Sequence, residues 1–228
     1  MSGLEVLHAD NHLLVVNKPA GVPMVPDVSR DESLLERAKA WVKREYSKPG
    51  DVFLGVVHRL DRPVSGVVVF ARTSKAAKRL SAHIRERKVT KTYWGIVEGE
   101  VKPHAGELEQ LLWKDERRNR VHVVAAGRAG AKAAHTGYRR FAGTEAWSAL
   151  ELVPHTGRSH QLRVACASLG APLVGDLKYG AREGLPGRGI ALHARSLELT
   201  HPTTGWGIHF QAPLPAHPVW DPLRDWKE

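Results

Sequence analysis

The stretch His58-Arg59-Leu60-Asp61-Arg62-Pro63-Val64-Ser65-Gly66 stands immediately before the apolar run Val67-Val68-Val69-Phe70. This run is short, continuous and rich in β-branched residues, which predicts a buried strand. Pro63 and Gly66 punctuate the loop in front of that strand. Basic residues on both sides of Asp61 favour its ionised form, because nearby opposite charge lowers the pKa of a carboxyl group. On these residues alone, a surface salt bridge that closes the loop is the commoner explanation of such an aspartate.

The composition favours an anionic partner. The 228 residues include 34 Lys and Arg against 24 Asp and Glu, which gives a net charge of +10. Nucleic acid is the commonest partner of so basic a soluble domain, although a charge surplus that serves only solubility remains the alternative. The single cysteine, Cys166, excludes an internal disulfide framework and a multi-cysteine metal site. No apolar run approaches the roughly 20 residues that span a bilayer, and no signal peptide is evident, so we expect a cytoplasmic protein that does not enter membranes.

The remaining chain alternates short strands with three helical segments. Hydrophobic spacing, caps and turn residues predict helices over 31–46, after Thr73 or Ser74, and up to Gly170. The same signals predict a hairpin over 4–17, two strands within 107–124, a flexible loop over 181–189, and strands over 91–97, 146–152, 190–194, 197–200 and 206–210.

The helix after Thr73 is unusually basic. Lys75, Arg79 and Arg85 lie outside its apolar stripe, and Glu86 is the only acid between residues 72 and 91. A solvated helix face is the usual meaning of such a run. A face nearly free of acids is also a candidate for contact with phosphate groups.

Three ordered motifs resemble those of the RluA-type pseudouridine synthases. His58–Gly66 resembles H-R-L-D-x-x-T-S-G, with Val64 in place of the usual threonine, and the segment 91–93 resembles K-x-Y. The segment 151–180 resembles E-L-x-x-x-T-G-R-T-H-Q-I-R…G-x-P-x-x-G-D-x-x-Y-G. Shorter matches are the K-P-x-G of residues 18–21 and the ending L-H-A…H-P-x-T-G…F-x-A-P-L-P of residues 192–215. The resemblance extends over roughly residues 4–215.

The resemblance implies an α+β pseudouridine synthase fold, in which a mixed, mostly antiparallel sheet is flanked by helices and loops and an active-site cleft crosses the sheet. It implies one catalytic domain over residues 1–228, without the extra N-terminal RNA-binding domain of many relatives. It implies an isomerase that converts specific uridines of structured RNA, in a ribosomal or transfer RNA stem-loop, to pseudouridine. We expect a monomer that needs no cofactor. We also expect no metal, because the thirteen histidines include no pair at ligand spacing with an acid.

The family motifs also suggest roles for individual residues. Asp61 is the expected catalytic carboxylate, Arg163 its ion-pair partner, and Tyr93 the residue that packs on the uracil ring. Whether Asp61 attacks covalently, stabilises positive charge at C1′ or removes a ribose proton stays open. Arg59 would enter the space left by the flipped nucleotide, since unstacking must be offset by new contacts. Further expected RNA or substrate contacts are His58, Arg62, Arg158, His160, Leu192, Lys75, Arg79 and Arg85.

Two other classes of function fit the sequence less well. A non-catalytic RNA-binding protein on the same fold is disfavoured by the complete set of Asp61, Tyr93 and Arg163. A phosphotransferase is excluded because the acid has the wrong spacing for a kinase loop and no G-x-G-x-x-G segment precedes it.

Overall fold

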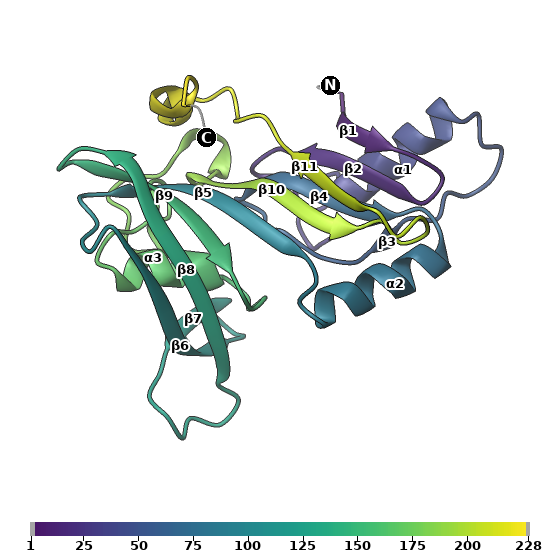
Figure 1. The fold of residues 1–228 in the computed structure, drawn as a ribbon. Helices are drawn as coiled ribbons and strands as arrows, with labels where there is room; N and C mark the ends of the chain where they lie inside the picture. The colour runs from purple at the N-terminus through teal and green to yellow at the C-terminus, as the bar shows by residue number, and fades with distance from the viewer. Residues whose placement is uncertain (1–2, 227–228) are drawn as a thin grey trace. The chain divides into compact units, whose positions relative to one another are not determined.

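The computed structural model describes residues 3–226, which form two compact units. The first unit comprises Met1–Thr90 and Ala194–Pro215, and the second comprises Lys91–His193 and Ala216–Glu228. The expectation of a single domain over the whole chain stays a prediction. Strands and helices follow the chain order shown in Figure 1.

The first unit is built on the sheet order β1-β2-β4-β10, with β11 beside β10 and β3 beside β4 (Figure 1). Two helices, α1 and α2, belong to this unit. The bounds are β1 Glu5–Ala9, β2 Leu13–Lys18, α1 Leu34–Glu45, β3 Gly55–Val56, β4 Ser65–Ala71, α2 Ser74–Arg85, β10 Leu192–Thr200 and β11 Gly207–Gln211.

Strand β4 is the centre of this unit, and all seven of its residues are buried. Val67 and Val69 face a core that also contains Ala76 and Leu80 of α2. Val68 and Phe70 point to the opposite face and are fully buried too. A strand buried on both faces must be apolar throughout, which is why this run has no polar alternation.

Both helices begin where the sequence predicts a cap. The Ser33 side chain accepts a hydrogen bond from the Glu36 amide, and the Glu36 carboxylate accepts one from the Ser33 amide, which completes a capping box. Thr73 caps α2 by accepting a hydrogen bond from the amide of Ala76. The prediction of a helix from residue 31 was slightly too long, since α1 starts only after Ser33.

The second unit contains the sheet order β5-β9-β8-β6-β7, in which every neighbouring pair is antiparallel. Helix α3 packs on this sheet through Val164, which contacts a cluster that includes Leu112 and Tyr179. The bounds are β5 Thr90–Glu98, β6 Ala105–Asp115, β7 Arg120–Val123, β8 Lys132–Gly143, β9 Trp147–Pro154 and α3 Gln161–Ser168, followed by the 3₁₀ turns Leu177–Tyr179, Pro186–Arg188 and Pro218–Leu223.

Two predicted elements differ from the structure. The strands expected over 190–194 and 197–200 are one continuous strand, β10. The polar residues between them keep the strand conformation and do not interrupt the strand. The loop expected over 181–189 contains a 3₁₀ turn at Pro186–Arg188. None of the helices within the described residues 3–226 is long and apolar enough to cross a membrane.

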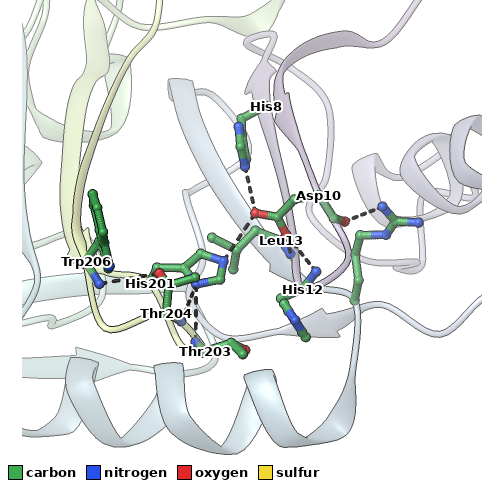
Figure 2. A network of polar contacts seen from close by, with 9 residues as sticks. His8, Asp10, His12, Leu13, His201, Thr203, Thr204 and Trp206 are labelled. Atoms are coloured by element: carbon green, nitrogen blue, oxygen red, sulfur yellow. Dashed lines mark hydrogen bonds and ion pairs between the residues drawn. The ribbon is translucent and has the colours of Figure 1, made fainter.

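Asp10 ties the first hairpin to the turn between β10 and β11 (Figure 2). Its carboxylate accepts hydrogen bonds from the amides of His12 and Leu13, at 2.6 and 2.7 Å, and contacts the rings of His8 and His201 at 2.8 and 3.2 Å. Nδ1 of His201 accepts from two backbone amides, so Nε2 is the nitrogen that donates to Asp10. Burial raises the pKa of Asp10, but its hydrogen bonds with His8, His12 and Leu13 outweigh this effect and lower the pKa to about 2. The turn of residues 201–205 (H-P-T-T-G) therefore has a structural role, because it holds the first hairpin against the end of β10.

Candidate active site

The Asp61 loop connects β3 to β4 in the first unit and contains a turn in which the Val64 amide donates to the Asp61 carbonyl at 3.0 Å. Arg59 is exposed, Leu60 is 6% exposed, and the Asp61 side chain is partly accessible. The buried leucine fixes the loop to the core while its two neighbours remain accessible. An accessible carboxylate on an anchored loop is what contact with a substrate requires.

Lys18 at the end of β2 is the main anchor of this loop. It is completely buried, and its ammonium donates hydrogen bonds to the carbonyls of Pro19, Arg62 and Val64 at 3.0, 3.0 and 2.7 Å. Two of these carbonyls lie one and three residues after Asp61. Burial lowers the pKa of Lys18 from 10.5 to about 7, while the charge on Asp61 raises it and the charge on Arg62 lowers it. Three carbonyl acceptors satisfy all three protons of the ammonium form. The sequence marked this lysine only as part of a turn motif.

His58 and Gly66 hold the two ends of the loop. Nε2 of His58, a buried residue, accepts a hydrogen bond from the amide of Val69 at 3.0 Å, which fixes the ring against β4. Gly66 has a φ of +118°, and a Cβ at this position would lie 2.3 Å from the carbonyl oxygen of Ala194 in β10. Only glycine permits that approach. Besides Asp61, the motif therefore contains residues that hold the loop in its conformation. The buried position of His58 favours such a structural role over the predicted RNA contact.

Arg62 also serves the loop. Its Nε donates to the Gly21 carbonyl at 2.9 Å, and its guanidinium forms ion pairs with Asp31 and, at 3.8 Å, with Asp27. These contacts join the loop to the segment before α1. In the structure, the Arg62 side chain forms these contacts within the protein, and its role as an RNA contact stays a prediction.

Arg163, on α3 of the second unit, forms a buried bidentate ion pair. Its Nε and Nη2 lie 2.7 and 2.6 Å from the two carboxylate oxygens of Asp176, and both side chains are less than 10% exposed. Its guanidinium also lies 5.0 Å from the centre of the Tyr179 ring. Two parallel hydrogen bonds fix the plane of the guanidinium, so Asp176 orients Arg163. The expected pairing of Arg163 with Asp61 of the first unit stays a prediction.

Residues at the start of α3 form a network of hydrogen bonds with β7, β8 and the Tyr179 side chain. His160 is buried with a left-handed backbone, and its Nδ1 contacts the Tyr179 hydroxyl at 2.7 Å. That hydroxyl accepts from the Val121 amide at 2.8 Å. The Gln161 amide group forms four hydrogen bonds, to the hydroxyls of Thr156 and Thr136, the amide of Arg158 and the carbonyl of His135. The His160 ring points into this buried network, and its role as an RNA contact stays a prediction.

Other predicted contacts have different positions. Arg158 is exposed, with Nε donating to the Ala133 carbonyl at 2.8 Å. Tyr93 lies on β5 and is 9% exposed, and Leu192, at the start of β10, is 3% exposed. Their roles toward a uracil ring stay predictions.

The basic residues of α2 meet the expectation of an accessible face. Lys75, Arg79 and Arg85 are all exposed. Arg79 also donates to the carbonyl of Pro202, so one of the three cations braces the turn between β10 and β11.

Sequence inspection missed one cluster with metal-ligand chemistry. Within residues 3–226, Glu107, His135 and His155 form a group whose ligand atoms all lie within 4.8 Å of one another. These residues come from β6, from β8 and from the position just after β9. A search for ligands close together in the sequence cannot find a site assembled across three strands.

Similarity to known proteins agrees with this architecture. A human protein named RNA Pseudouridylate Synthase Domain Containing 4 superposes with a TM-score of 0.77 at 27% identity, over 93% of this chain and 89% of that one. A second human structure, RNA Pseudouridylate Synthase Domain Containing 1, gives a TM-score of 0.73 at 28% identity, over 96% and 87% of the two chains. The fold is thus the α+β fold of pseudouridylate synthase domains, as predicted.

Sequence similarity identifies the family. The model of the RNA pseudouridylate synthase family matches residues 12–168, and the chain belongs to this family, whose members are isomerases. The dual-specificity RNA pseudouridine synthase RluA of Haemophilus influenzae is 34% identical over 92% of each chain. The ribosomal large subunit pseudouridine synthase D of Pseudomonas aeruginosa is 33% identical over 95% of this chain and 70% of its own. An uncharacterized RNA pseudouridine synthase of Synechocystis is 34% identical over 94% of this chain, which spans 66% of that relative's length.

Proposed function

We propose that this protein is an RNA pseudouridine synthase that isomerises uridines of structured ribosomal or transfer RNA, with Asp61 as its catalytic carboxylate. The observation that carries the proposal is the Asp61 loop, where Lys18, His58 and Gly66 fix the backbone and leave the carboxylate accessible. A surface salt bridge contributes only about 0 to 1 kcal/mol. A purely structural Asp61 would therefore not explain why the protein buries the Lys18 ammonium to hold this loop.

The reaction requires few groups and is balanced without a redox partner. The bond between ribose C1′ and uracil N1 breaks, the base turns, a bond forms between C1′ and C5, and the C5 proton is lost as N1 gains one. Asp61 would act at C1′ or at the ring, as nucleophile, charge stabiliser or base. Tyr93 would pack on the uracil ring, Leu192 would line the pocket, and Arg163 would face Asp61. A stem-loop substrate, a monomeric state and a cytoplasmic location complete the proposal.

Substitution of Asp61 by asparagine tests the assignment, because it keeps the size of the side chain and removes its charge. The assay is tritium release from RNA labelled at C5 of uridine, with RNA binding measured in parallel. We expect a folded variant that binds RNA and releases no tritium, and a normal rate from the control Asp51→Asn, which alters an exposed acid in the connection between α1 and β3. Normal release by Asp61→Asn would refute the role of Asp61. Binding without release by the wild type itself would favour a non-catalytic RNA-binding protein.

The exposed cations of α2 would contact the phosphates of the same RNA. Replacing Lys75, Arg79 and Arg85 together by glutamine should lower the slope of log K against log salt by roughly 0.7 to 0.9 for each phosphate that the variant no longer neutralises. A matched control removes three exposed cations of α1 instead, at positions 39, 43 and 44. Equal slopes for the two triple variants would exclude α2 as the phosphate-binding face.

A further inference from the structure

The cluster of Glu107, His135 and His155 follows from the register of three antiparallel strands. His135 stands beside the His155 position, since Thr136 pairs with Pro154 and the His155 amide donates to the His135 carbonyl at 3.0 Å. Glu107 pairs with Gly137, which is two residues from His135 and therefore on the same face of β8. The three side chains consequently share one face of the second unit's sheet.

Gly137 provides the space that lets the carboxylate reach the histidines. A Cβ at this position would lie 2.9 and 3.2 Å from the two carboxylate oxygens of Glu107. Any side chain other than hydrogen would push Glu107 away from its present place. With glycine there, Oε2 of Glu107 lies 2.8 Å from Nε2 of His135 and 3.6 Å from Nε2 of His155.

The backbone around His135 is rigid. Its amide donates to the Thr156 hydroxyl at 3.0 Å, and its carbonyl accepts from the Gln161 side chain at 2.9 Å. Thr156 and Gln161 are also joined to each other at 2.8 Å. The segment that bears His155 is thereby fixed to the strand that bears His135, and two ligands held in this way lose little conformational entropy on binding an ion.

The donor set suits a borderline transition-metal ion. Two imidazoles and a carboxylate are ligands of Zn²⁺, Ni²⁺ and Cu²⁺, and three protein ligands leave a position for water. Zinc bonds of about 2.0 to 2.1 Å at tetrahedral angles separate ligand atoms by roughly 3.3 Å. The two distances from Glu107 lie on either side of that value. The imidazole centres of His135 and His155 are 4.4 Å apart, so both rings lie beside the Glu107 carboxylate.

We propose that Glu107, His135 and His155 bind one divalent transition-metal ion of the zinc class, which fixes β8 to the segment 155–161 that leads into α3. The ion would be structural. Because α3 carries Arg163, it would stabilise the position of a predicted active-site residue without contacting substrate. The metal site itself does not depend on the proposed RNA chemistry.

Binding of Zn²⁺ to chelator-treated protein tests the site. Isothermal titration of the wild type with ZnCl₂ should show one ion per chain, and titration with Co²⁺ should give the visible absorption of a tetrahedral His-containing site. The double variant His135→Gln and His155→Gln should lose at least tenfold in affinity together with the cobalt spectrum. The control double variant His122→Gln and His209→Gln, which removes two accessible histidines on other strands, should behave as the wild type does.

Amide hydrogen exchange separates a structural site from incidental binding by a histidine-rich surface. In the wild type, one equivalent of Zn²⁺ should slow exchange over residues 155–161, and it should have no such effect on the His135 and His155 double variant. Equal affinities for the two double variants, or binding that leaves exchange of this segment unchanged, would overturn the proposal. The outcome of these measurements does not depend on whether the protein releases tritium from RNA, so failure of the metal site and failure of the proposed function can be told apart.

Discussion

Lys18→Met is the substitution that best tests how the Asp61 loop is held. Methionine fills nearly the same volume and removes the three donors to Pro19, Arg62 and Val64. Leaving three buried carbonyls without this donor costs about 1 kcal/mol each or more, roughly 3 kcal/mol in all. Against this loss stands the cost of burying the ammonium, whose pKa is lowered from 10.5 to about 7. At about 1.36 kcal/mol per unit, that cost is roughly 4 to 5 kcal/mol near neutral pH.

These opposing free energies nearly cancel, so the fold should survive. We expect the free energy of unfolding of Lys18→Met to stay within about 2 kcal/mol of the wild type. Turnover should nevertheless fall by about 100-fold or more, because a displacement of about 1 Å in a catalytic group can cost that much. Tritium release measures turnover, urea denaturation measures stability, and Lys39→Met, on the exposed face of α1, is the matched control.

The pH dependence supplies a second readout of the same residue. Between about pH 7 and 10.5 the unfolded chain keeps the Lys18 proton while the folded protein releases it. Because the unfolded state then binds more protons, the Lys18 contribution to stability must rise with pH across this window. The difference in unfolding free energy between wild type and Lys18→Met should therefore increase from pH 7 to pH 10. A flat difference would refute the lowered pKa of Lys18, and a Lys18→Met protein with wild-type turnover would refute the anchoring role.

Three further predictions concern separate parts of the molecule. Asp176→Asn leaves the Arg163 guanidinium buried without its carboxylate, and should lower the urea unfolding free energy by about 3 to 5 kcal/mol; a loss below 1 kcal/mol would show that Asp176 does not carry the pair. Asp10 has a pKa of about 2 against an ordinary 3.8, so its contribution is complete above pH 4 and disappears as the pH falls toward 2. Since this carboxylate is partly exposed, screening reduces the contribution to about 1 kcal/mol, and Asp10→Asn should remove that acid-sensitive component from a pH series of unfolding curves. Arg59→Ala alters an exposed side chain, so it should change stability by less than about 0.5 kcal/mol and slow turnover on a stem-loop more than on a short single strand; unfolding of this variant, or equal rates on both RNAs, would contradict a role in base flipping.

The sequence alone determined the local elements and the family. Periodicity and caps located α1 and α2, because the Ser33 and Thr73 bonds involve residues only three positions away. The uninterrupted apolar run of β4 predicted a buried strand, and the structure confirms this burial and shows that it extends to both faces. The three motifs identified the family because they preserve chemical groups in order along the chain. Local signals misled at 190–200, where a polar residue between the two predicted strands pairs with β11, since Ser196 stands opposite Gln211.

Only the tertiary structure decided which partners those residues meet. Lys18 reaches carbonyls 44 and 46 residues away, Arg163 reaches Asp176 across a turn, and the Glu107, His135 and His155 cluster depends on the register of three strands. The periodicity of a strand shows which face a residue occupies, but not which residue of the neighbouring strand stands opposite. That choice depends on packing summed over the whole sheet, and no segment of the sequence contains it by itself.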